Sequence, residues 1–323
     1  MKAKKGNEKD SLPKMQPQAK KGKLRKEIWK NRYLYLMLLP LLAWLAVLCY
    51  APMYGILLAF KEYNASLGVW KSPWVGMKHF QRLFITPDAV KALTNTLVIN
   101  LGRLVFTFPM PIILALLITE MPGGKRVKKW SQTFLTFPHF LSWVVVSTIL
   151  TNFLAQSGAV NKLIVSMGGE PVNFLGNTKL FRWMLFLTAN WKEAGWAAII
   201  YMAAITGVDM ELYDAAKVDG ASRWKQIWNI TLPSIRPTIA VMFILEVGSM
   251  MTAGFDQVFN LRNGAVKSVA QILETYVYDI TFLAVPNYGF STAVGLFTAV
   301  ANFAMLLLAN KVVYWLTGEK MFS

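Results

Sequence analysis

Four ionisable residues stand inside long apolar stretches of the sequence: Arg103, Lys192, Glu193 and Glu246. Charged side chains are costly in lipid, so such residues face the interior of a helix bundle, a partner charge or water, and they commonly mark a transport path. Two are positive and two negative, so interhelical ion pairs are one interpretation and a solute passage is the other. Because adjacent residues on a helix do not face each other, we expect Lys192 and Glu193 to pair elsewhere, Lys192 for example with Glu246.

Further polar and aromatic residues extend the candidate passage. A ligand pocket needs only a few well-placed polar groups, and sugars commonly bind to aromatic faces as well. The additional candidates are Asn190, Trp191, Trp196, Asp256, Gln257 and Asn302. Arg103 and Lys192 would suit an acidic sugar.

The sequence gives little support for a metal site, a cofactor site or a catalytic site. The single cysteine, Cys49, lies in an apolar stretch, and the two histidines, His79 and His139, stand far apart in the sequence. We therefore expect neither a metal site nor a Cys–His nucleophile pair. The sequence lacks a Gly-x-x-x-x-Gly-Lys-Ser/Thr loop, so we expect no ATP or other cofactor on this chain. We see no Ser, His and Asp constellation that would indicate an enzyme.

Long apolar stretches dominate the 323 residues, of which 55% are hydrophobic and 16% charged. A membrane-spanning helix needs about 20 consecutive apolar residues. Six stretches qualify: 33–60, 92–119, 133–155, 181–205, 238–257 and 289–316. Several contain proline, which a membrane bundle tolerates because neighbouring groups satisfy the freed carbonyls. We predict an all-α, polytopic membrane protein with six transmembrane helices.

The net charge of +17 is concentrated at the N-terminus, where residues 1–32 hold 12 Lys or Arg and three acids. We interpret these residues as a basic cytoplasmic tail that contacts anionic lipid rather than nucleic acid. The first apolar run is too long for a signal peptide. With the tail inside, the cytoplasmic segments carry 21 Lys or Arg and the external loops nine. Both termini are therefore expected in the cytoplasm, and residues 33–323 form the transmembrane domain.

The connection between the fourth and fifth spans, about 208–236, has the pattern of two short helices. Residues 210–218 suit a helix, Gly220 permits a turn, and Ser222 is a reasonable N-cap for the next helix. That second helix is amphipathic, with three residues on one face: Trp224, Ile227 and Trp228. Pro233 then stops or kinks the chain. On these residues alone, a helix that merely anchors the loop at the membrane surface is an equal alternative.

The same segment carries a spaced motif. Asp214-Ala215-Ala216 is followed after three residues by Gly220, after nine more by Ile230, and after one more by Leu232-Pro233. This resembles the Glu-Ala-Ala signature of ABC importer permeases, with Asp214 in place of Glu. The motifs Arg32-Tyr33-Leu34-Tyr35, Phe80-Gln81-Arg82-Leu83-Phe84 and Trp191-Lys192 are similar to the bacterial branch that imports sugars, oligosaccharides and polysaccharide fragments.

The resemblance implies a type I ABC importer permease fold in the bacterial inner membrane, and it makes 208–236 a coupling loop. Such a permease pairs with a second, related permease, two ATP-binding subunits and an extracytoplasmic substrate-binding protein. Gly220 would permit a sharp turn and close contact with the ATPase, Asp214 would lie near its basic groups or cap a helix, and Ala215 and Ala216 would allow close approach. ATP would bind to the partner subunit.

The alternative is a secondary transporter driven by an ion gradient. Such proteins often contain inverted repeats and interrupted helices near the membrane midplane. The sequence shows no matched pair of halves, and that interpretation leaves the coupling motif unexplained.

Overall fold

The structure is a computed structural model that describes residues 29–252 and 254–318. In these residues the chain is helical apart from turns and one isolated β-bridge, between Lys61 and Trp74. The predicted all-α fold is confirmed. Most of the predicted basic tail, residues 1–28, lies outside the described residues. The chain divides into two compact units, 1–55 and 56–323, each of which is considered by itself.

In the first unit, α2 (Arg32–Leu45) continues into a π-helix (Ala46–Tyr50) and then into a 3-10 helix (Ala51–Phe60) that extends into the second unit. Pro40 lies inside α2, and Pro52 lies in the first turn of the 3-10 helix. Proline lacks a backbone N–H and therefore interrupts the regular α-helical bonding. The two prolines therefore account for the change from an α-helix to a π-helix and then to a 3-10 helix in this segment.

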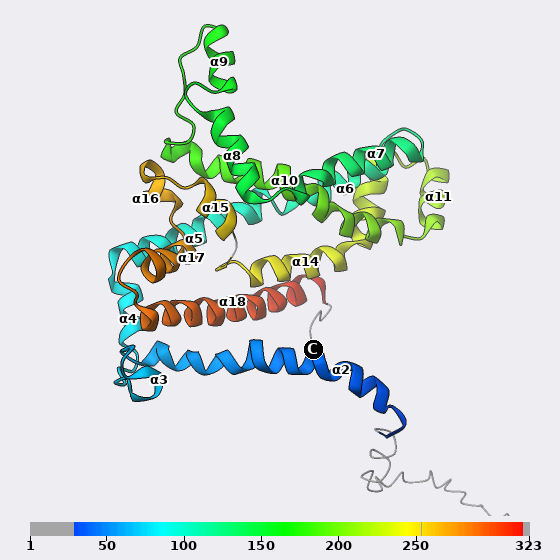
Figure 1. Cartoon of the computed structure of the whole chain (residues 1–323). Helices are drawn as coiled ribbons and strands as arrows, with labels where there is room; N and C mark the ends of the chain where they lie inside the picture. Colours follow the sequence, from blue (N-terminus) through cyan, green and yellow to red (C-terminus); the bar gives the residue numbers. More distant parts are fainter. Residues whose placement is uncertain (1–28, 253, 319–323) are drawn as a thin grey trace, which may run out of the picture. The chain divides into compact units, whose positions relative to one another are not determined.

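The second unit contains the remaining helices (Figure 1). Their bounds are α3 Gly68–Lys71, α4 Lys78–Ile85, α5 Pro87–Phe106, α6 Pro109–Glu120, α7 Lys125–Thr136, α8 Trp143–Leu154, α9 Ala159–Ser166, α10 Thr178–Thr206, α11 Met210–Val218, α12 Arg223–Gln226, α13 Leu232–Ser234, α14 Arg236–Gly248, α15 Phe255–Leu261, α16 Lys267–Ala270, α17 Leu273–Tyr278 and α18 Tyr288–Thr317. Short 3-10 or π segments join several of them.

Four helical segments of the described chain are long and apolar enough to cross a membrane: Arg32–Phe60, Pro87–Glu120, Trp143–Ser166 and Tyr288–Thr317. Two bent pairs also qualify when each pair is taken as one span. They are Thr178–Thr206 with Met210–Val218, bent by 71°, and Arg223–Ser234 with Arg236–Gly248, bent by 62°. By length and composition the total rises to six, which agrees with the number of spans predicted.

Two predicted spans are interrupted in the structure. The predicted span 133–155 is divided by a 3-10 turn at Phe137–Phe140, after which Ser142 caps α8 by accepting a hydrogen bond from Val145 N. The predicted span 238–257 was also wrong as a continuous helix, because α14 ends at Gly248 and α15 begins only after Gly254. Proline in the first break and glycine in the second explain why apolar composition did not produce one helix.

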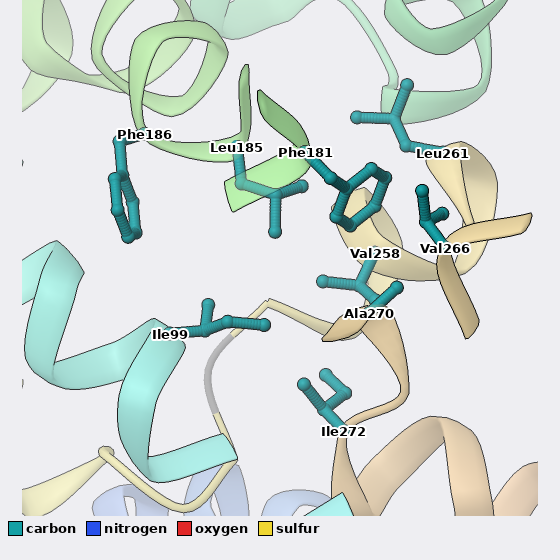
Figure 2. Packing of buried hydrophobic residues seen from close by; sticks show 9 residues of the cluster. All are labelled: Ile99, Phe181, Leu185, Phe186, Val258, Leu261, Val266, Ala270 and Ile272. Carbon is teal, nitrogen blue, oxygen red and sulfur yellow. The ribbon is translucent and has the colours of Figure 1, made fainter. Parts of the chain in front are cut away.

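Long helices of the second unit pack in pairs, α10 against α6 and α14 against α18 (Figure 1). The largest buried cluster joins α5, α10 and the segment from α15 to α16. Figure 2 shows its side chains, which include Ile99, Phe181 and Val258. This packing fixes α15 against α5 and α10, and these three helices surround the polar site described below.

Candidate functional site

The predicted coupling loop begins with α11, which has a regular cap at each end. Asp209 accepts a hydrogen bond from Glu211 N at 3.0 Å and caps the N-terminus. At the C-terminus, Gly220 N donates to Lys217 O at 3.1 Å and Ala221 N donates to Ala216 O at 2.8 Å. This pair of bonds is a Schellman motif. The predicted helix 210–218 is confirmed, and its ends are fixed by local hydrogen bonds.

Gly220 has φ +72°, in the left-handed region that residues with a side chain adopt at a cost. A Cβ atom built there would meet no atom within 4 Å. The backbone conformation therefore favours glycine here, whereas the space around it within this chain would admit a side chain. The predicted turn at Gly220 is confirmed.

The outer face of α11 is exposed. Asp214 forms an ion pair with Lys217 at 2.8 Å, and both side chains are more than half exposed. Of the two roles expected for Asp214, the cap of α11 is made by Asp209, and proximity to basic groups of an ATPase stays a prediction. Apolar residues beside the motif are also exposed, among them Leu212 and Val218. Ala215 is exposed and Ala216 is half-buried.

The second helix of the loop is tied to the first. Ser222 caps α12 by accepting from Lys225 N at 3.4 Å, as predicted. A π-helix (Ile227–Thr231), which includes Ile230, follows and leads into α13. The Tyr213 hydroxyl on α11 lies 2.9 Å from Thr231 Oγ1. This hydrogen bond connects the exposed helix to the segment that enters the membrane domain.

Leu232 anchors the loop to the long helices. It packs against a buried cluster that includes Ala198 and Tyr201 of α10 and Ile235. Pro233 lies in the first turn of α13, and the chain bends by 62° between Ser234 and Arg236. The predicted kink after Pro233 is confirmed. A displacement of α11 would therefore reach α10 and α14 through a short, packed connection.

The amphipathic face of the second helix lies along α6. Trp224, Ile227 and Trp228 line an apolar groove of about 540 Å³ with Ile112 and Leu116 of that helix. Trp224 remains 71% exposed. The three residues do share one face, as predicted.

A mainly apolar cavity of about 320 Å³ that contains a few charged and polar groups lies between the helices α5, α6, α8, α10, α14 and α15. Of the residues predicted for a passage, it is lined by Arg103, Glu193, Glu246 and Gln257. Aromatic side chains share the wall, namely Phe108, Trp143 and Tyr201. Four of the predicted residues, from four different helices, thus meet in one cavity.

Arg103 on α5 is the buried cation of this cavity. Its Nη2 donates to Gln257 Oε1, and Gln257 Nε2 in turn donates to Leu185 O at 2.8 Å and to Thr188 Oγ1 at 2.7 Å. Arg103 Nε has no hydrogen-bond partner in the described chain, and neither has Oγ1 of Thr107, which also lines the cavity. Buried polar atoms are nearly always paired. Both atoms are shielded from solvent, and they are exceptions to this rule within the described chain.

An irregular corner joins α14 to α15, and its last residue, Gly254, lines the cavity. Side chains from other helices satisfy its backbone: Asn100 Nδ2 donates to Met250 O at 2.5 Å, and Met251 N donates to Asn302 Oδ1 at 2.8 Å. Non-helical backbone at membrane depth is tolerated where it is buried in protein or lines a cavity. Asn302 thus holds the corner and is absent from the cavity lining.

Gly254 ends this corner with φ +102°. A Cβ atom there would lie 2.2 Å from Arg103 Nη1. Glycine is therefore required twice, by its backbone angle and by the close approach of the guanidinium group.

The expected pairing of Lys192 with Glu246 was wrong. Lys192 Nζ lies 2.7 Å from Glu193 Oε1 and donates to His139 O at 2.9 Å. Glu193 Oε2 also lies 2.6 Å from His139 Nδ1. Adjacent residues point apart at Cβ, but the four-carbon lysine chain curls back far enough to reach its neighbour's carboxylate. Lys192 thereby ties α10 to the break between α7 and α8.

Other predicted residues lie outside the cavity lining. Asn190 donates to Phe106 O at 3.1 Å, Trp191 and Asp256 are exposed, and Trp196 stacks on His139 at 4.5 Å between ring centroids. Sequence reasoning also missed Trp143 and Tyr201. Tyr201 could have been found, because it lies eight residues after Glu193 on α10 and helical residues at this spacing share one face.

Glu274 on α17, outside the spanning segments, is partly buried. Burial raises its pKa to about 7, and the charge of Asp256 adds to the effect while that of Arg103 opposes it. This carboxyl group therefore changes its charge near neutral pH.

Comparisons with known proteins agree with this geometry. Residues 108–317 match the family described as "Binding-protein-dependent transport system inner membrane component". The polygalacturonan/rhamnogalacturonan transport system permease protein YteP of Bacillus subtilis (strain 168) is 44% identical over 293 residues, which cover 90% of this chain and 91% of that protein.

Two crystal structures are similar over nearly their whole length. A bacterial ABC transporter involved in the import of the acidic polysaccharide alginate has a chain with a TM-score of 0.84 and 38% identity, covering 91% of this chain and 99% of that one. A bacterial alginate ABC transporter in complex with an alginate pentasaccharide-bound periplasmic protein gives a TM-score of 0.85 and 37% identity, covering 93% and 100%.

Proposed function

The chain belongs to the family of binding-protein-dependent transport system inner membrane components, and from this premise we propose that it forms half of the passage by which an ATP-driven importer takes up a sugar or oligosaccharide. The relative YteP is named for polygalacturonan and rhamnogalacturonan transport, and the similar solved chains belong to alginate transporters. These names support a carbohydrate substrate. The chain itself catalyses no reaction and binds no ATP.

The observation that carries the proposal is the cavity around Arg103. Its wall combines aromatic faces with the polar residues Arg103 and Thr107, whose Nε and Oγ1 atoms have no hydrogen-bond partner in the described part of the chain. A hydroxyl-rich solute needs this combination. Lys192 neutralises Glu193, and Arg103 and Glu246 contribute one charge of each sign. The charges are balanced, so hydroxyl groups rather than net charge determine binding in this cavity.

The exposed α11 is the docking site for an ATP-binding subunit in this proposal. Ala215 and the neighbouring Leu212 and Val218 offer a surface for a partner, and Asp214 supplies a charge at its edge. When the ATPases close, α11 moves and the Tyr213–Thr231 bond and Leu232 carry the motion to α10 and α14. Both helices line the cavity, so the displacement changes its width.

The partners follow from the same proposal. They are a second related permease, two ATP-binding subunits and an extracytoplasmic substrate-binding protein, in the bacterial inner membrane. The Lys- and Arg-rich segments face the cytoplasm together with both termini, and the loops 61–91, 156–180 and 258–288 face outward. The N-terminal tail contacts anionic lipid.

The test is reconstitution of the complete importer in proteoliposomes with its binding protein and a labelled oligosaccharide. We expect uptake that requires ATP and continues when ionophores dissipate ion gradients. We also expect Thr107→Val, which removes one unpaired hydroxyl with little change of shape, to lower uptake while the importer still assembles. Uptake that stops with the ion gradient and ignores ATP would contradict the proposal.

A further inference from the structure

A second pocket, of about 420 Å³, lies beyond the C-terminal end of α15. Its polar lining comprises Arg262, Asn263, Lys267, Gln271 and Asp279. Gln257 of the inner cavity stands in the first turns of the same helix. Arg262 lies five positions after Gln257, which corresponds to about 7.5 Å along the helix axis at the usual rise per residue. Gln257 thus lines the inner cavity from the first turn of α15, and Arg262, the residue that follows the helix, lines the outer pocket.

One side of this outer pocket is held rigidly. Arg262 Nη1 and Nη2 donate to the two carboxylate oxygens of Asp279 at 2.8 and 2.7 Å, and the guanidinium group lies over the Phe259 ring at 4.9 Å from its centroid. Gln271 Nε2 donates to the same carboxylate at 3.2 Å. Bidentate pairs of this kind have a fixed geometry. The pocket thus presents preformed polar groups.

Lys267 is the cation of this pocket that has no partner in the described part of the chain. It is exposed at the start of α16, and neither a hydrogen bond nor an ion pair holds its ammonium group. Arg262 and Asp279 cancel each other, so the pocket carries a net charge of +1 from Lys267. The inner cavity, by contrast, is balanced.

The loop 258–288 that holds the pocket is balanced in charge, whereas the loops assigned to the external face are positive when taken together. The three loops assigned to the external face contain nine Lys or Arg against five Asp or Glu, a net charge of +4. A surface of one sign attracts solutes of the opposite sign and raises their association rate. The external face of this chain is therefore suited to an anionic solute.

We propose that the outer pocket binds the carboxylate of an acidic saccharide unit before the sugar chain reaches the inner cavity. This inference rests on the proposed function. Lys267 pairs with the carboxylate, while the Asp279 and Gln271 oxygens accept hydrogen bonds from hydroxyl groups of the same unit. The outer pocket thus selects acidic sugars, and the inner cavity binds the hydroxyl-rich units as they pass.

The test uses the complete importer in nanodiscs, without the binding protein, and two fluorescent probes of equal length, tetragalacturonate and neutral cellotetraose. The variant is Lys267→Glu. Lys162→Glu is the matched control, because Lys162 is likewise exposed and unpaired in an external loop. At low ionic strength we expect Lys267→Glu to weaken tetragalacturonate binding by roughly three- to tenfold, an effect that salt removes. Cellotetraose binding and the control variant should be unchanged.

Two outcomes would overturn the inference: equal losses for both probes, or no loss for either. If a separate titration with the binding protein then showed that Lys267→Glu lowers only the affinity of that protein for the importer, the pocket would be a protein-docking surface instead. ATP-driven uptake of a saccharide by the unaltered importer, measured alongside, separates these outcomes from failure of the proposed function.

Discussion

The coupling loop and the cavity corner each contain a glycine in the left-handed region, but their surroundings differ. Around Gly220 a Cβ atom would meet nothing within 4 Å, whereas at Gly254 it would lie 2.2 Å from Arg103 Nη1. The coupling loop is exposed and determined by local hydrogen bonds. The corner is only partly buried, and side chains from α5 and α18 fix its backbone. The comparison supports the proposal that a partner protein packs on the first region, whereas contacts within this chain already fix the second.

The largest effect should come from Gly254→Ala. Left-handed strain and the clash with Arg103 together should cost about 2–4 kcal/mol. We expect a lower thermal unfolding temperature in detergent. We also expect the rate of uptake to fall at least tenfold, which corresponds to about 1.4 kcal/mol. Gly295→Ala on α18 is the control, because a Cβ there meets nothing and alanine favours the helix. Equal behaviour of the two variants would remove the distinction between the regions.

A smaller effect is expected within the coupling loop. Tyr213→Phe removes the hydrogen bond to Thr231, which should cost about 0.5–1.5 kcal/mol. Because this bond joins α11 to the segment entering the membrane domain, we expect more ATP hydrolysed per sugar transported, with assembly preserved. Thr231→Val should give the same change, and the double variant should add nothing further. Additive effects would show that the two hydroxyls act separately.

The smallest effect concerns pH. Glu274 has a pKa of about 7 in the folded chain, against an ordinary value of 4.5, so the folded state favours its protonated form. Its contribution to stability is therefore lost as pH rises between these values. We expect the unfolding temperature to fall between about pH 5 and pH 8 and Glu274→Gln to reduce that fall. A pH dependence identical in both proteins would exclude this carboxyl group as its source.

The two regions also differ in how far the sequence predicted them. The helix 210–218, the turn at Gly220 and the Ser222 cap depend on neighbouring residues, and all three were predicted correctly. Arg103 was recognised as a buried cation, but its bond to Gln257 joins residues 154 positions apart, which no local pattern reveals. The pairing of Lys192 was predicted wrongly, because helix geometry describes Cβ directions and not the reach of a long side chain.

The positions at which the spans break were harder to predict than the number of spans. Six apolar stretches were correctly recognised, yet the ends of α7 and α14 depend on Pro138, Ser142 and Gly254 and on side chains such as Asn302 that satisfy the open backbone. The apolar composition of a segment predicts that it will enter the membrane. It does not predict where the helix breaks, because the side-chain amide that bonds to the open backbone comes from a distant part of the sequence.

The central claim is that α11 and its turn form the contact with a separate ATP-binding subunit. The most direct test purifies the tagged chain from detergent together with its partners. Three forms are compared: the unaltered chain with Gly220, and the variants Gly220→Asn and Gly220→Val. Asparagine tolerates the left-handed conformation and valine does not. We predict that Gly220 and Gly220→Asn recover both a second permease and an ATP-binding subunit, and that Gly220→Val retains the permease but loses the ATPase. Recovery of the ATPase with all three, or isolation of the chain alone in every case, would contradict the account.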